Sequence, residues 1–240
     1  MFCCATLAGA GVAADTPDKP FEPTVGQQGK DVVWVPTPPV LVEKMLDVAR
    51  VTPQDYVMDL GSGDGRNIIA AAKRGARALG VEYNPDMVAL SQRTAEKEGV
   101  ADKAQFVQGD MYEADISKAT VMALFLLPEN LNKLAAKFIA LKPGSRIVAN
   151  QFAVSGWEPD ESGTAEGDCG SWCNWLLYVV PAQAAGCWRL QKGELELEQK
   201  FQMLTGTFTE NSVSTAIENV EANGVADDHG QPRDGNRRGV

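Results

Sequence analysis

A glycine-rich turn is the strongest chemical signal in the sequence. Residues 57–66 read VMDLGSGDGR and lie between an apolar, strand-like run and a helix-like segment. Because glycine has no side chain, such a turn lets a ligand approach the backbone at the amino end of a helix, where the amide groups are free. Tight strand-to-helix turns also use glycine for geometry alone. The neighbouring residues therefore decide between a binding site and a plain turn.

The residues around this turn favour a ligand that carries an amino group and a ribose. A dinucleotide site would need a small residue where Arg66 stands, and Asp59 and Asp64 would repel its pyrophosphate. Those carboxylates suit an ammonium group. Glu82 follows Gly61 by 21 positions, where a carboxylate can accept hydrogen bonds from both ribose hydroxyls. A ribose and an amino acid in one ligand point to S-adenosylmethionine.

The composition excludes several other chemistries. The chain has 240 residues, 44% of them hydrophobic and 22% charged, which is typical of globular proteins. Its net charge of −10 gives no positive field for a phosphate backbone, so we expect no nucleic-acid partner. The single histidine, His229, sits among Gly, Asp and Pro residues near the C-terminus, which argues against His-based triads and His-rich zinc sites. No two cysteines have the C-x-x-C spacing, so no metal site is predicted.

Alternating strands and helices place the turn in an α/β sheet. Thr37-Pro38-Pro39 begins a helix, and Thr52-Pro53 ends it. The predicted strands cover 56–60, 78–82, 104–108, 121–127 and 146–152, and the predicted helices between them cover 67–74, 85–98 and 129–141. This alternation predicts a parallel sheet with right-handed crossovers. We therefore expect a Rossmann-like sheet with helices on both faces, in a domain over residues 37–152.

The pattern changes after Phe152, where strands follow one another without helices. Strands are predicted over 172–180, 187–191, 194–208 and 212–220. We expect a C-terminal antiparallel β extension over residues 153–225, followed by a mobile tail over 226–240. Cys169 and Cys173 lie close enough for a disulfide in an exported protein, although free thiols are the expectation.

The stretch from Trp34 to Phe152 resembles the class I S-adenosylmethionine-dependent methyltransferases through its G-x-G-x-G turn. The resemblance implies a site for the methionine part of the cofactor formed by Asp59, Gly61, Ser62, Gly63 and Asp64. It places the ribose diol on Glu82. It places the adenine at Gly109-Asp110-Met111, with Asp110 accepting from the adenine amino group and Met111 against the ring.

A narrower resemblance rests on Val35-Pro36-Thr37-Pro38 together with residues 59–66. These segments are similar to a bacterial group of methyltransferases, often exported, related to lysine methyltransferases that act on the c-ring of the mitochondrial ATP synthase. This likeness implies that Thr37, Tyr83 and Asn84 also line the cofactor site. The β extension lies outside it, so the acceptor stays open between a small molecule and a protein. A non-catalytic S-adenosylmethionine-binding module remains the alternative function.

The acceptor side of the site is less defined. Residues 125–130 read FLLPEN and depart from the Asp/Asn-Pro-Pro-aromatic motif of amino-directed methyltransferases. Glu129 is the candidate catalytic residue, yet a carboxylate there also stabilises a helix N-terminus without catalysis. We expect the acceptor to enter between residues 127–130 and the β extension. Either core packing of the extension or an aromatic wall for a cationic or apolar acceptor explains Trp157, Trp172, Trp175 and Trp188.

The amino-terminal residues have the pattern of a targeting segment. Residues 1–14 are uncharged and end in Val12-Ala13-Ala14, which predicts a signal-like segment and a periplasmic location. A cytoplasmic location is the alternative, because no positive residue precedes the apolar run. The run is too short to span a bilayer, so we expect no stable membrane insertion. Residues 15–36 are expected to form an extended arm. The pattern does not indicate an oligomeric state.

Overall fold

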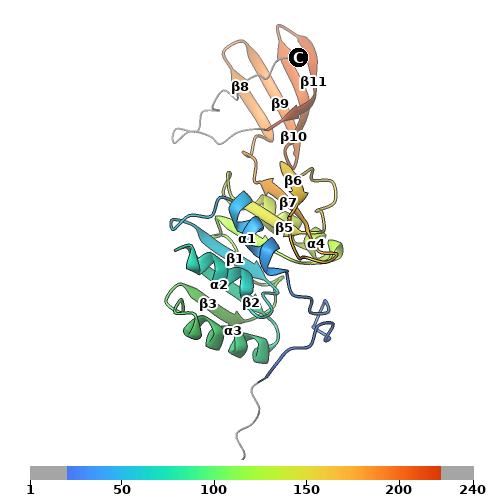
Figure 1. Cartoon of the computed structure of the whole chain (residues 1–240). Coiled ribbons are helices and arrows are strands. Elements are labelled where there is room, and N and C mark those ends of the chain that lie inside the picture. Colours follow the sequence, from blue (N-terminus) through green and yellow to red (C-terminus); the bar gives the residue numbers. More distant parts are fainter. Residues whose placement is uncertain (1–20, 223–240) are drawn as a thin grey trace, which may run out of the picture.

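Seven strands form the main sheet of the computed structural model, which describes residues 21–222 (Figure 1). Their spatial order is β3-β2-β1-β4-β5-β7-β6. The strands are β1 (Tyr56–Leu60), β2 (Arg77–Glu82), β3 (Ala104–Gln108), β4 (Val121–Leu124), β5 (Arg146–Asn150), β6 (Glu161–Thr164) and β7 (Asn174–Val179). Strands β1 to β5 are parallel, whereas β7 runs antiparallel to both β5 and β6. The strand order reverses between β1 and β4, which is where α/β sheets bind ligands.

Helices cover both faces of this sheet, as predicted. The helices are α1 (Pro39–Val48), α2 (Arg66–Lys73), α3 (Pro85–Lys97) and α4 (Pro128–Ile139). The apolar side chains of α1, α2 and α3 pack into one core on one face, and those of α4 pack into a second core on the other. Alternate residues of β1 supply both cores: Val57 belongs to the first and Met58 to the second. The sheet is therefore buried on both sides, which explains its nearly continuous apolar strands.

Two predicted strands were wrong in their extent. The strand predicted over 121–127 ends at Leu124, because the next three residues leave the sheet and Pro128 begins α4. The strand predicted over 194–208 is a hairpin of β9 (Gly193–Lys200) and β10 (Met203–Glu210). Its turn contains Phe201 with a φ of 52°, a conformation that sequence patterns assign to Gly or Asn. The ring of Phe201 stacks on that of Trp157, with the ring centres 4.9 Å apart.

The boundary predicted for the β extension also needs correction. Strands β6 and β7 lie within residues 153–225, yet β7 pairs with β5, β6 pairs with β7, and both complete the main sheet. The separate antiparallel sheet is shorter and has the order β11-β10-β9-β8, with β8 at Gly186–Leu190 and β11 at Val213–Glu221. It projects from the end of the main sheet that carries β6 and β7 (Figure 1). The short strand β6 was missed because its residues are polar and exposed.

The four tryptophans from Trp157 onward do not form one wall. Trp157 and Trp175 are buried in the two cores, so the packing interpretation holds for them. Trp188 lies on β8 and is 48% exposed. Trp172 lies in the loop before β7 and lines a pocket.

Two predicted segments lie outside the described residues. These are the signal-like segment 1–14 and the tail 226–240. None of the helices within residues 21–222 has the length and apolarity needed to cross a membrane.

Asp55, directly before β1, bonds to residues at the amino ends of β4 and β5. Its Oδ1 accepts a hydrogen bond from Thr120 Oγ1 at 2.7 Å and forms an ion pair with Arg146, while its Oδ2 accepts from the Thr52 amide at 2.8 Å. Burial alone would raise the pKa of Asp55, but the hydrogen bonds from Thr120 and Thr52 and the charge of Arg146 lower it below its ordinary value. The ionised form of Asp55 is therefore the one that stabilises the fold.

We expect Asp55→Asn to lower the free energy of unfolding at pH 7 by about 1 kcal/mol, the difference between hydrogen bonds to a charged and to a neutral acceptor. Because the pKa of Asp55 is lowered by folding, its contribution is full above the unfolded pKa of about 3.9 and is lost as the pH falls through the folded pKa. Urea unfolding of both chains at pH 7 and pH 3 checks this. A difference between the chains that is the same at both pH values would contradict it.

Candidate cofactor and acceptor site

The glycine turn between β1 and α2 curls back over the end of β2. The amides of Gly61 and Ser62 both donate to the Val81 carbonyl, at 2.8 and 3.1 Å. Gly61, Gly63 and Gly65 have φ values of 71°, 56° and 80°, in the left-handed region that side chains disfavour. A Cβ atom on Gly63 would also lie 2.6 Å from Trp34 Nε1. The backbone geometry thus requires glycine at these positions.

Glu82 joins this turn to the next one. Its Oε2 accepts a hydrogen bond from the Gly63 amide and its Oε1 accepts from the Asn84 amide, each at 2.9 Å. Asn84 in turn caps α3 by accepting from the Asp86 amide at 2.9 Å. Glu82 lines the pocket, and each of its carboxylate oxygens keeps one further lone pair, so a diol can bind there without displacing either backbone bond.

Asp59 lies buried beneath the turn with one carboxylate oxygen unused. Its Oδ2 accepts from Asn67 Nδ2 at 3.0 Å, but its Oδ1 has no hydrogen-bond partner among the described residues. Burial raises the pKa of the Asp59 carboxyl well above its usual range; the hydrogen bond from Asn67 opposes that rise, and the charges of Glu82 and Asp64 add to it. A cationic group above the turn would stabilise the ionised form of Asp59. Together with Glu82, the residues therefore fit a ligand with an ammonium group and a ribose.

One pocket, with about 1150 Å³ of empty space including its open mouth, collects about half of the predicted cofactor residues. The predicted residues that line it are Gly61, Glu82, Tyr83, Asn84, Asp110 and Met111. The carboxyl ends of the parallel strands form its floor, as expected for this sheet.

The remaining predicted cofactor residues are not among those that line the pocket. Besides Asp59, these are Thr37, Ser62, Gly63 and Asp64. Arg66 holds two of them together, because its guanidinium pairs with Asp64 at 2.5 Å and donates to the Thr37 carbonyl at 2.7 Å. Arg66 therefore links the glycine turn to the start of α1. Direct contact of Thr37 and Asp64 with the cofactor remains a prediction.

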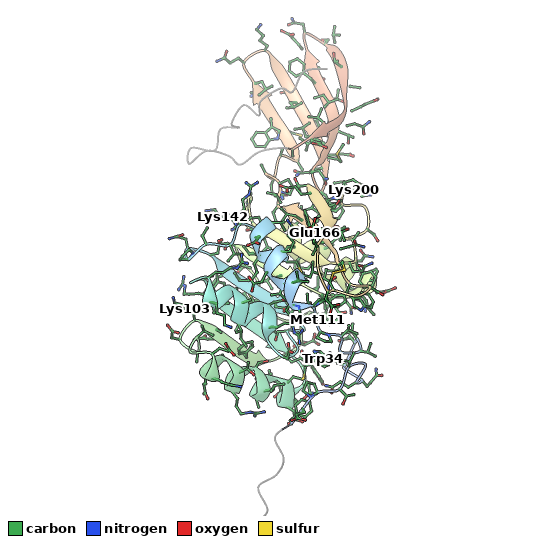
Figure 2. All side chains as sticks on the ribbon, viewed as in Figure 1. Trp34, Lys103, Met111, Lys142, Glu166 and Lys200 are labelled. Carbon is green, nitrogen blue, oxygen red and sulfur yellow. A yellow bond between two sulfur atoms is a disulfide. The ribbon has the colours of Figure 1, made fainter. Side chains whose placement is uncertain are left out.

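The amino-terminal arm forms one side of the pocket, which sequence patterns did not predict. Residues 27–35 line the pocket, and Figure 2 shows Trp34 of this arm on the same side of the molecule as Met111. Lys30 Nζ pairs with Asp110 Oδ2 at 2.5 Å and lies 4.9 Å from the ring centre of Tyr83. The hydrogen bond from Lys30 and one from the Tyr112 amide lower the pKa of Asp110, so this residue is ionised at neutral pH. The sequence signal for this placement of the arm was the apolar run at 32–35, because apolar side chains are stabilised by burial against the rest of the protein.

Glu129 is not brought to the pocket. It is exposed in the first turn of α4, and the residues that line the pocket do not include it. Its neighbour Asn130 is buried and donates to the Tyr112 hydroxyl at 2.7 Å. The placement of Glu129 fits stabilisation of the helix N-terminus, and its catalytic role remains a prediction.

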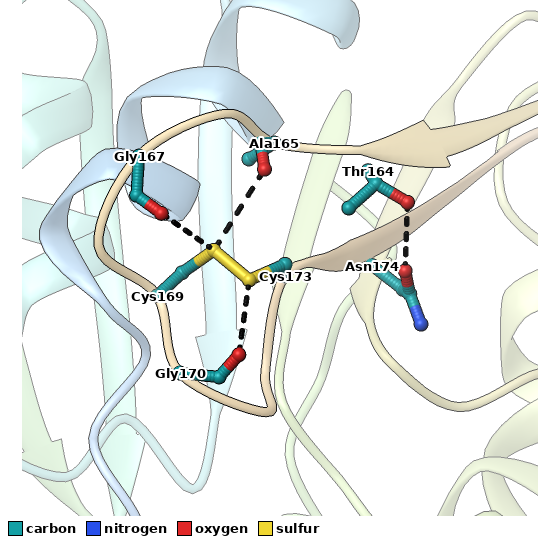
Figure 3. Close-up of a disulfide and its surroundings, with 7 residues drawn as sticks. All are labelled: Thr164, Ala165, Gly167, Cys169, Gly170, Cys173 and Asn174. Carbon is teal, nitrogen blue, oxygen red and sulfur yellow. Dashed lines mark hydrogen bonds between the residues drawn. A yellow bond between two sulfur atoms is a disulfide. The ribbon is translucent and has the colours of Figure 1, made fainter.

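Three aromatic side chains line the other end of the pocket. Phe125 follows β4, Phe152 follows β5, and Trp172 precedes β7. The Phe125 and Trp172 ring centres lie 5.4 Å apart, and Phe152 lies 6.2 Å from Trp172. The loop that carries Trp172 contains a disulfide between Cys169 and Cys173 (Figure 3), so the expectation of free thiols was wrong for this pair.

Comparisons with known proteins agree with this geometry. Residues 59–161 match the model of the ANTKMT methyltransferase domain. Over 134 residues the chain is 44% identical to a protein-lysine N-methyltransferase of Saccharolobus islandicus, covering 54% of this chain and 83% of that protein. It is also 41% identical to a solved RNA methyltransferase from Salinibacter ruber in complex with S-adenosyl-L-homocysteine. The chain belongs to this family of S-adenosylmethionine-dependent methyltransferases. The Salinibacter likeness has a TM-score of 0.59 and covers 62% of this methyltransferase and 96% of that chain.

A further relative, from Rattus norvegicus, is a lysine N-methyltransferase of the ATP synthase c-subunit and is 35% identical over 149 residues. The match covers 62% of this methyltransferase and 62% of that protein's length. Its other vertebrate counterparts are covered over 54–58% of their lengths. The second sheet, from Gly186 onward, lies outside the family model match.

The residues at the polar end of the pocket fit the cofactor of this family. Glu82 would hold the ribose, Asp110 and Met111 the adenine, and the glycine turn above Asp59 the amino-acid part. S-adenosylmethionine supplies a methyl group on a positively charged sulfur, which keeps the bonding electrons when an acceptor lone pair takes the methyl carbon. Such a transfer chiefly requires an acceptor atom in line with that methyl group in a site from which water is excluded.

Proposed function

We propose that this methyltransferase methylates the side-chain amine of lysine in a protein acceptor. The supporting observation is the 44% identity to a protein-lysine N-methyltransferase, of which the match covers 83%. The apolar, aromatic end of the pocket adds support, because none of the lining side chains from β4, β5 and the loop before β7 is charged. An amine loses its proton more readily in such surroundings than in water, and a neutral amine is the form that attacks a methyl group.

RNA is the second candidate acceptor, because the Salinibacter structure is of an RNA methyltransferase. Stacking on aromatic rings would also suit a base. The net charge of −10 counts against it, since binding a phosphate backbone depends on clustered Lys and Arg residues.

The test is the full chain incubated with methyl-labelled S-adenosylmethionine and either a cell protein extract or total RNA. We expect label in material that protease destroys and ribonuclease does not, and mono-, di- or trimethyllysine after acid hydrolysis. The Glu82→Ala chain serves as the control for background labelling. Label confined to RNA, or to an amino acid other than lysine, would overturn the proposal.

We also propose that the chain acts in an oxidising compartment outside the cytoplasm. The Cys169–Cys173 disulfide supports this, because such bonds rarely persist in the reducing cytoplasm. Alkylation of the chain in intact cells, followed by mass spectrometry, distinguishes the two locations. Alkylated Cys169 and Cys173 would contradict export.

A further inference from the structure

The pocket has two chemically different ends. Its charged lining residues are Lys30, Asp31, Glu82 and Asp110, which come from the amino-terminal arm and from the ends of β2 and β3. The opposite end is formed by Phe125, Leu126, Leu127, Phe152 and Trp172. The polar end matches the cofactor, so the apolar end remains for the group that receives the methyl.

The three aromatic rings at the apolar end are only half-buried. Phe125, Phe152 and Trp172 contact one another, with ring centres 5.4–6.4 Å apart, but each keeps part of its surface open to the pocket. The rings of Trp157 and Tyr178 in the adjacent core are fully buried, whereas these three rings line the pocket. Apolar surface left facing a pocket is characteristic of a binding site.

The backbone holds Phe152 in place at some cost. Gln151, directly before Phe152, has a φ of 67°, although it is not glycine, and its amide donates to the Asn174 carbonyl at 2.8 Å. Such strain persists only where the surrounding structure enforces it, and it gathers at functional sites. The strained backbone at Gln151 turns the chain at the end of β5, and the next residue, Phe152, lines the pocket.

Trp172 is held by a closed loop. The Ala165 amide donates to the Cys173 carbonyl at 2.8 Å, and the Trp172 amide donates to the Cys169 carbonyl at 3.0 Å. The disulfide between Cys169 and Cys173 is drawn in Figure 3. It closes a loop of five residues in the sequence, and Trp172 is one of them. The covalent bond therefore limits how far Trp172 can move from Phe125.

The chemistry of this end suits lysine better than other protein acceptors. The four methylenes of a lysine side chain can pack along aromatic faces, and the methylated ammonium product is attracted to the same faces. An arginine would keep its charge in this apolar site, because its pKa is too high for deprotonation. A carboxylate would enter without a cationic partner among the aromatic lining residues.

Building on the proposed function, we propose that Phe125, Phe152 and Trp172 form the acceptor-lysine site, and that the Cys169–Cys173 disulfide positions Trp172 within it. The site binds the aliphatic stem of the lysine and the alkylated ammonium group of the product. The rings are binding residues, and the disulfide is a positioning element.

The test measures binding without turnover, in the presence of saturating S-adenosylhomocysteine. The probe is Nα-acetyl-N6-trimethyllysine, titrated at millimolar concentrations by calorimetry. We expect Trp172→Ala to weaken probe binding by about 3- to 30-fold, the range for a lost cation–π contact. We expect its S-adenosylhomocysteine affinity to stay within about twofold of the parent, because the proposed cofactor contacts are at the other end of the pocket. Trp188→Ala, on the exposed β8, is the matched control and should leave both affinities unchanged.

Several outcomes would overturn this assignment. Equal probe binding by Trp172→Ala and Trp188→Ala would remove Trp172 from the site, as would loss of S-adenosylhomocysteine binding in Trp172→Ala. No probe binding to the parent chain, or tighter binding of a nucleoside monophosphate than of the probe, would overturn the lysine site itself. Unchanged probe binding after reduction of the disulfide would refute its positioning role. If the parent chain methylates lysine with an unaltered KM in Trp172→Ala, the assignment fails while the proposed function stands.

Discussion

Replacing Glu82 with alanine is expected to weaken binding of S-adenosylmethionine and S-adenosylhomocysteine by about 10- to 150-fold. This range corresponds to about 1.5–3 kcal/mol, the contribution of hydrogen bonds to a charged group. The carboxylate faces the pocket, and it also accepts from the Gly63 and Asn84 amides at 2.9 Å. Alanine would remove the ribose contact and release two turns of the pocket at once. Calorimetry with S-adenosylhomocysteine measures the loss.

The matched control for this variant is Glu98→Ala. Glu98 is also a glutamate beside α3, but it pairs with Lys73 on the surface and does not line the pocket. Its replacement should leave cofactor affinity unchanged, because exposed ion pairs contribute at most about 1 kcal/mol and act locally. Glu82→Gln sharpens the test: the amide NH₂ of glutamine would face one of the two backbone donors, so it should not restore binding. Full affinity in either Glu82 variant would remove this residue from the ribose site.

The glycine turn and the position of Glu82 beside it were predictable from sequence because their determinants are local. The glycine turn and Glu82 each follow a strand of a regular α/β repeat, and parallel strands bring their carboxyl ends to one edge. The turn at 61–65 and the strand end at Glu82 therefore come together without any contribution from more distant segments of the chain. Both lie where the pattern placed them.

The acceptor half was not predictable because it depends on contacts between distant segments. The aromatic end combines residues 125, 152 and 172, and nothing in their spacing predicts that they meet. The apolar run at 121–127 predicts one buried strand, since periodicity cannot show that its last residues leave the sheet for a pocket. The amino-terminal arm is similar, because Lys30 reaches Asp110 across 80 positions of sequence.

The second large effect is expected for Gly63→Val. Valine resists the φ of 56° that this position requires, and its Cβ would lie 2.6 Å from Trp34 Nε1. Backbone strain of about 1–3 kcal/mol and a similar cost for the collision predict a loss of about 2–6 kcal/mol in unfolding free energy. The arm that carries Trp34 lines the pocket, so its displacement should also weaken S-adenosylhomocysteine binding by about tenfold or more. Urea unfolding and calorimetry measure the two effects separately.

Gly99→Val separates the strain from the collision. Gly99 has a φ of 69°, close to that of Gly63, but a Cβ there would meet nothing within 4 Å. This control should lose only about 1–3 kcal/mol in unfolding free energy and keep its cofactor affinity, because it carries the strain without the contact. Adding Trp34→Ala to Gly63→Val should recover stability relative to the sum of the two single variants, since the collision is then absent. If Gly63→Val and Gly99→Val are equally destabilised and both bind S-adenosylhomocysteine as the parent does, the 61–65 turn is a plain strand-to-helix connection and holds no ligand.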